Sequence, residues 1–95
     1  LNVKLENDNI IENLSVYPNP FTEQYSVFIN SDYSERIKVS VINVAGSTVY
    51  QDEKNIISGD NTIVLSGTDL KPGTYFLNIK GNTINKTIPI VKMNR

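Results

Sequence analysis

Apolar residues occupy every second position along most of the chain beyond residue 13. Ile37, Val39 and Val41 form one such stretch, with Lys38 and Ser40 between them. Because successive side chains of a strand point to opposite faces, this pattern predicts half-buried β-strands, and no stretch has the 3.6-residue period of a helix. The predicted strands span residues 14–17, 25–30, 37–42, 48–52, 62–66, 74–80 and 83–91.

Turn-forming residues separate these strands, as expected for an antiparallel fold. Val44-Ala45-Gly46-Ser47 and Ser58-Gly59-Asp60-Asn61 predict two turns. Gly81-Asn82 predicts a two-residue hairpin loop of type II′, because glycine comes first. Pro89 lies inside the last predicted strand and lacks an N–H donor, so we expect an edge position or a bulge there. Seven short strands with this spacing predict an all-β antiparallel sandwich or small barrel.

The first part of the chain differs from the rest. Residues 1–13 are polar and acidic, lack periodicity and predict a flexible linker. They contain no apolar stretch typical of a signal peptide, and the first residue is not Met, so we expect a fragment of a longer protein. A chain of 95 residues suffices for one domain, which we place at residues 14–95.

The composition excludes several kinds of chemistry. The chain has no cysteine and no histidine, so it cannot form a Ser-His-Asp triad or a zinc site of Cys and His ligands. Its ten carboxylates lie mostly at predicted turns and strand ends, which favours a solvated surface over an acid–base pair. Asp60-Asn61 lacks the spaced acidic pattern of a calcium loop, and turn chemistry explains it better. We therefore expect no enzyme, metal or cofactor.

Charge is unevenly distributed although the net charge is only −1. Every charged residue after Asp69 is basic: Lys71, Lys80, Lys86, Lys92 and Arg95. A nucleic-acid site would combine this basic segment with Tyr75 and Phe76 for stacking, but neighbours in a strand point to opposite faces, so we expect no nucleic-acid partner. No run of about 18 apolar residues suggests a membrane span.

Two proline-containing segments predict rigid corners. Tyr17-Pro18-Asn19-Pro20 has two fixed φ angles and lacks two N–H donors, so it ends the first strand in a stiff corner. In Leu70-Lys71-Pro72-Gly73-Thr74-Tyr75, Pro72 and Gly73 suit the central positions of a type II turn. Each segment alone is explained by corner geometry.

Four segments together resemble the C-terminal sorting domain, type A, of type IX secretion cargo in Bacteroidota. They are Val16–Pro20, Val39–Gly46, Leu70–Phe76 and Lys86–Lys92, and the resemblance covers residues 14–93. It implies a seven-stranded Ig-like sandwich that the type IX outer-membrane translocon recognises in the periplasm. Pro89 departs from the family pattern, since it interrupts a last strand that is commonly continuous.

The resemblance also implies partners and site residues. The N-terminally linked cargo would reach the cell surface or the medium, and a sortase-like cysteine peptidase would usually remove the domain within or beside residues 1–13. Of the motif residues, we expect the last-strand lysines to contact the translocon and the corners to build the shape that is recognised. The motif residues are Pro18, Asn19, Pro20, Gly46, Pro72, Gly73, Tyr75, Lys86 and Lys92.

Two other functions remain open from the sequence. Five tyrosines on a sandwich suit an Ig-like or fibronectin-like accessory module that binds carbohydrate or protein on a secreted enzyme or adhesin. A flat row of exposed aromatic side chains would support that hypothesis. The third possibility is a passive structural spacer.

Overall fold

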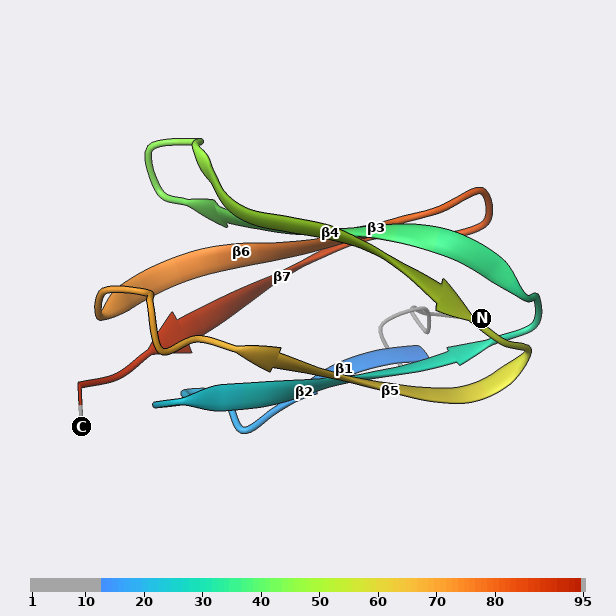
Figure 1. The fold of residues 1–95 in the computed structure, drawn as a ribbon, viewed down its shortest axis with the longest axis horizontal. Helices are drawn as coiled ribbons and strands as arrows, with labels where there is room; N and C mark the ends of the chain where they lie inside the picture. Colours follow the sequence, from blue (N-terminus) through green and yellow to red (C-terminus); the bar gives the residue numbers. More distant parts are fainter. Residues whose placement is uncertain (1–12, 95) are drawn as a thin grey trace, which may run out of the picture.

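The computed structural model describes residues 13–94, which form seven β-strands (Figure 1). The strands are β1 (Leu14–Tyr17), β2 (Gln24–Ser31), β3 (Glu35–Asn43), β4 (Thr48–Ile56), β5 (Gly59–Ser66), β6 (Gly73–Lys80) and β7 (Asn85–Lys92). Within this part of the chain there is no helix long and apolar enough to cross a membrane.

The strands form two antiparallel sheets that pack face to face (Figure 1). One sheet has the order β1-β2-β5 and the other has the order β4-β3-β6-β7. The chain therefore changes sheet between β2 and β3, between β4 and β5, and between β5 and β6. This arrangement confirms the predicted all-β, Ig-like antiparallel sandwich. It differs from the seven-stranded constant-type Ig sandwich in the fourth strand, which pairs here with the third strand and not with the fifth.

The core lies between the sheets and follows the alternation seen in the sequence. Val27 of β2, Val39 of β3 and Leu77 of β6 are fully buried. Each such side chain contributes about 1.5–3 kcal/mol through removal of apolar surface from water. The fully buried core also contains Phe21, which precedes β2 and belongs to no strand.

The predicted turn at Ser58-Gly59-Asp60-Asn61 is wrong, because β5 already begins at Gly59. The chain changes sheet at residues 57–58. The Asn61 side chain accepts a hydrogen bond from Ile57 N at 2.9 Å and donates one to Ile57 O at 2.9 Å. A turn-forming residue therefore lies inside the strand, where its side chain completes the connection.

The prediction of a two-residue loop at Gly81-Asn82 is also wrong, by one position. Lys80 pairs with Asn85, and Gly81 N donates to Ile84 O at 2.7 Å, so the bend is centred on Asn82 and Thr83. A side chain far away in sequence fixes this register: Glu35 Oε1 accepts hydrogen bonds from both N–H groups of the bend.

The expectation for Pro89 is confirmed, since β7 is an edge strand. Pro89 lies opposite Phe76 of β6, and its carbonyl points away from β6 toward Asn19. The missing N–H would point the same way, so the proline costs no hydrogen bond of the ladder. The boundary predicted after residue 13 stays a prediction, because residues 1–12 lie outside the described part of the chain.

Candidate functional site

The first proline corner transfers the chain from one sheet to the other. Val16 pairs with Val27 of β2 in the first sheet, whereas Phe21 forms a parallel bridge with Lys92 of β7 in the second sheet. Between them, the Tyr17–Pro18 and Asn19–Pro20 peptide bonds are both cis. The corner thus brings the start of the domain to the outer edge of its last strand.

Asn19 pairs with this edge through its side chain. Its Oδ1 accepts a hydrogen bond from Val91 N at 3.0 Å, and its Nδ2 donates one to Pro89 O at 3.1 Å. A side-chain amide has the same donor and acceptor as a peptide group, so Asn19 can replace a strand residue. The neighbouring Pro18 and Pro20 have no N–H, so the amide side chain adds a donor to a segment that has few.

Phe21 continues the pairing with its backbone and fills the core with its ring. Phe21 N donates to Val91 O at 2.9 Å, and Met93 N donates to Phe21 O at 2.8 Å. The ring is 1% exposed and lies 4.5 Å from the ring of Tyr25, centroid to centroid. A β-carbon on Gly67 would lie 2.2 Å from Phe21 Cε2, so only glycine fits beside this ring.

Lys92 of β7 adds side-chain contacts with Thr22 and Gly67. Although charged, it is 8% exposed. Its Nζ donates to Gly67 O at 2.7 Å and to Thr22 O, and it lies 5.8 Å from the centroid of the Phe21 ring. Buried charges are tolerated when they are hydrogen-bonded in this way. We call the group Asn19, Phe21, Gly67, Val91 and Lys92 the terminal clasp.

Gly46 lies in the β3–β4 turn, away from the terminal clasp. It has φ +91°, a conformation that side chains with a β-carbon rarely adopt. Gly46 N donates to Asn43 O at 2.9 Å, and Asn43 Oδ1 accepts from both Ala45 N and Ser47 N. This motif residue therefore maintains the hairpin between β3 and β4.

The second proline corner supports the start of β6. Gly73 has a positive φ, as predicted, but its value of +147° differs from the roughly +80° of a type II turn. Tyr75 is buried, and its hydroxyl donates to Lys71 O at 2.7 Å. The same bond defines the tyrosine corner of many Ig-like sandwiches, where it holds a strand-to-strand connection against the core.

A family model described as the secretion system C-terminal sorting domain matches residues 15–93. The chain belongs to this family. The sorting domain is thus a C-terminal signal for type IX secretion, which exports proteins to the cell surface or the extracellular space. No curated protein matches the chain.

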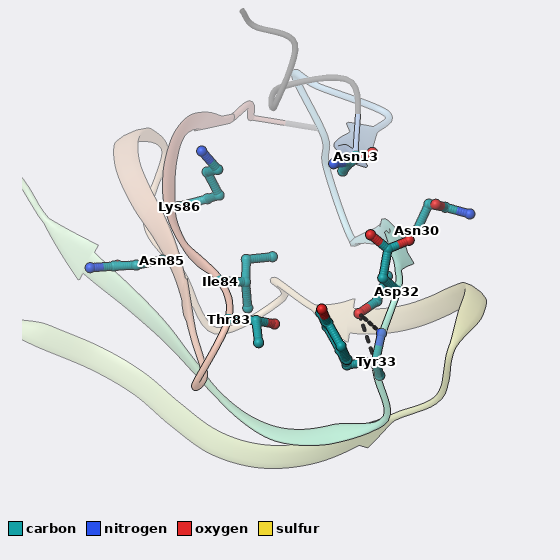
Figure 2. Close-up of a pocket in the computed structure, with 9 residues that line it drawn as sticks. Asn13, Asn30, Asp32, Tyr33, Thr83, Ile84, Asn85 and Lys86 are labelled. Carbon is teal, nitrogen blue, oxygen red and sulfur yellow. Dashed lines mark hydrogen bonds between the residues drawn. The ribbon is translucent and has the colours of Figure 1, made fainter.

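Lys86 lies at the other end of β7 of the sorting domain. It is six residues from Lys92, which corresponds to roughly 20 Å along a strand. Lys86 is half-buried and lines a cavity of about 330 Å³ at the end of the sandwich. The cavity is drawn in Figure 2, with Thr83, Ile84 and Lys86 on one side and Asn13, Asp32 and Tyr33 on the other.

Glu35 binds Thr83, which lines this cavity. Besides the two backbone bonds, its Oε2 accepts a hydrogen bond from the Thr83 hydroxyl. That hydroxyl, followed by the backbone N–H groups of Asn82 and Thr83, lowers the pKa of Glu35 below its ordinary value. A β-carbon on Gly81 would lie 2.6 Å from Glu35 Oε1, so this glycine allows the bend to approach the carboxylate.

Two acidic groups among residues 13–94 have shifted pKa values, and both are lowered. The pKa of Asp52 is lowered by the Glu53 N–H and then by Lys54, so neither Asp52 nor Glu35 has the raised pKa that a general acid needs at neutral pH. Burial, and then Tyr50, raises the pKa of Tyr25 to about 12. Among residues 13–94, no three acidic side chains come together to hold a metal.

Sequence reasoning identified Asn19 and Lys92 but not the residues that each of them contacts. It missed Phe21, Gly67 and Glu35. The available signal was an amide side chain between two prolines, since two of the three residues lack an N–H donor and the amide side chain can supply a donor and an acceptor. Nothing in the sequence marked Gly67 as different from the other glycines.

Proposed function

We propose that β7 is the strand of this sorting domain that the type IX translocon contacts, and that Lys86 provides a charge for that contact. The proposal rests on the contacts of the terminal clasp. It joins the Pro18–Pro20 corner to the second half of β7 and buries Lys92 in the process. Lys92 then serves to position the strand, whereas Lys86 keeps an accessible amine at the other end.

The remaining motif residues support the same strand indirectly. Tyr75 and Gly73 lie on β6, which is the neighbour of β7. They fix the start of β6. Gly46 maintains the hairpin of β3, which is the neighbour of β6. We propose that these residues build the shape of the signal without touching the translocon.

We propose further that a sortase-like peptidase removes the domain from an N-terminal cargo after passage through the periplasm and across the outer membrane. Leu14 supports a cleavage position on its N-terminal side. It is 3% exposed and pairs with Ile29, so the chain from this residue onward is part of the packed sheet. Cleavage before Leu14 would leave both the cargo and the folded signal intact.

The accessory-module hypothesis predicted a flat row of exposed aromatic side chains. Tyr25 and Tyr75 are core residues. The exposed tyrosines are Tyr17 at the first corner, Tyr33 between β2 and β3, and Tyr50 on β4, and they lie on separate elements. No specific observation favours carbohydrate binding, so we do not propose it.

A reporter fusion tests the proposal. A signal peptide and a reporter are placed before residues 1–95 in a bacterium with a type IX system, and surface reporter is compared with periplasmic reporter. We expect the wild-type fusion at the surface, and at least tenfold less for Lys86→Glu, with an unchanged melting temperature because Lys86 has no ion pair among the described residues.

The matched control is Lys80→Glu, which changes an exposed lysine on β6. It should be exported like the wild type. Equal export of Lys86→Glu and Lys80→Glu would contradict the assignment of Lys86 as a contact of the translocon.

A further inference from the structure

Residues 13–94 occupy only half of the outer edge of β7. Hydrogen bonds at Pro89, Val91 and Met93 show that odd-numbered residues direct their backbone groups away from β6. In a regular strand this phase continues to Thr87 and Asn85. Within residues 13–94, the outward N–H and C=O of Thr87 have no hydrogen-bond partner, whereas those nearer the C-terminus pair with Asn19 and Phe21.

The first proline corner explains why residues 14–17 do not cover this half of the edge. The segment that pairs with β7 at Phe21 and Asn19 turns away at Pro18, and residues 14–17 pair with β2 in the other sheet. A strand that continued along β7 would have covered Thr87. The corner therefore closes one half of the edge and leaves the other half without a neighbouring strand among residues 13–94.

The cavity of about 330 Å³ adjoins this open half. Asn85 and Lys86 of β7 line one side of it, and Asn13 and Asp32 line the other (Figure 2). Lys86 forms no ion pair with any described residue, and Ile84 provides a half-buried apolar surface that packs against the core. The cavity can hold one or two side chains but no folded element.

We propose that an extended peptide of a partner protein adds as a strand to β7 at Asn85–Thr87 and directs an acidic side chain toward Lys86. A row of unpaired N–H and C=O groups is matched by another peptide backbone, which is the basis of strand addition. Lys86 has no ion pair among the described residues, so a carboxylate of the added peptide can pair with its amine. This inference rests on the proposal that β7 is contacted, and it adds the chemistry of the contact.

Thr87→Pro tests the backbone part of this contact. Pro89 has the same phase and is accommodated, so proline at position 87 removes the outward N–H and keeps the pairing with β6. The matched control is Thr87→Ala, because both variants lose the Thr87 hydroxyl that Asn78 contacts at 2.9 Å. We expect at least tenfold lower export for Thr87→Pro than for Thr87→Ala, at equal melting temperatures.

The outcomes separate the two proposals. If Thr87→Pro is exported like Thr87→Ala while Lys86→Glu fails, β7 is contacted without strand addition, and this inference is overturned while the proposed function stands. If both Thr87→Pro and Lys86→Glu are exported normally, both proposals fail.

A peptide probe tests the partner chemistry directly. An end-blocked octapeptide of alternating valine and glutamate is titrated into the 95-residue chain, with a lysine-for-glutamate peptide as the charge control. We expect the Thr87 amide to become protected from hydrogen exchange with the glutamate peptide and less so with the lysine peptide. Equal protection by both peptides, or no protection at millimolar concentration, would overturn the inference.

Discussion

Replacement of Lys92 by alanine is expected to destabilise the domain by about 3 kcal/mol, because it removes a buried stem and leaves two carbonyls without their charged donor. In a domain of this size such a loss lowers the melting temperature by roughly 15 °C. Thermal unfolding followed by circular dichroism measures it. Export should fall in proportion to the folded fraction.

Two further variants identify the cause of that loss. Lys92→Met keeps most of the stem but not the amine, and we expect it to recover about half of the stability. Lys80→Ala, at an exposed position of β6, should change stability by less than about 0.5 kcal/mol. A Lys92→Ala domain that melts like the wild type but is not exported would mean that the translocon recognises Lys92 itself.

Gly67→Ala is expected to have the second-largest effect, with a loss of about 2 kcal/mol from overpacking. The new β-carbon would lie 2.2 Å from the Phe21 ring, which is buried and lies 4.5 Å from the Tyr25 ring, centroid to centroid. Gly67 is not among the glycines with positive φ, so the cost arises from this contact and not from the backbone. Denaturant unfolding measures the free-energy change.

A double-mutant comparison attributes the effect to the ring. In a Phe21→Leu background the side chain at position 21 is smaller, so Gly67→Ala should cost at least 0.5 kcal/mol less than in the wild type. An identical cost in both backgrounds would show that Phe21 is not the residue that requires glycine at position 67.

The strands could be predicted from the sequence because one face of each sheet is buried. Apolar and polar residues therefore alternate with a period of two along each strand. The stretch from Ile37 to Val41 is the clearest case, since its apolar positions are all buried in β3. The turn at residues 58–61 was predicted wrongly. Asn and Asp favour turns in general, but here the pairing of Asn61 with Ile29 decides the conformation.

The contacts of the site could not be predicted, because they join residues about 70 positions apart. The two last-strand lysines illustrate the difficulty. Both occupy even positions of β7 and therefore the same face, yet Lys92 is buried and Lys86 lines a cavity. Lysine is rarely buried without partners, so the sequence alone suggests exposure for both. Only the carbonyls of Thr22 and Gly67 explain why Lys92 differs.

We propose that the Pro18–Pro20 motif acts by holding the terminal strand through Asn19. Amide hydrogen exchange at Val91 tests it directly, because Val91 N donates to Asn19 Oδ1. We predict slow exchange in the wild type and at least tenfold faster exchange in Asn19→Ala, with Thr87 exchanging rapidly in both. Equal Val91 exchange in the two proteins would contradict the claim, since the strand edge would then be protected without the motif.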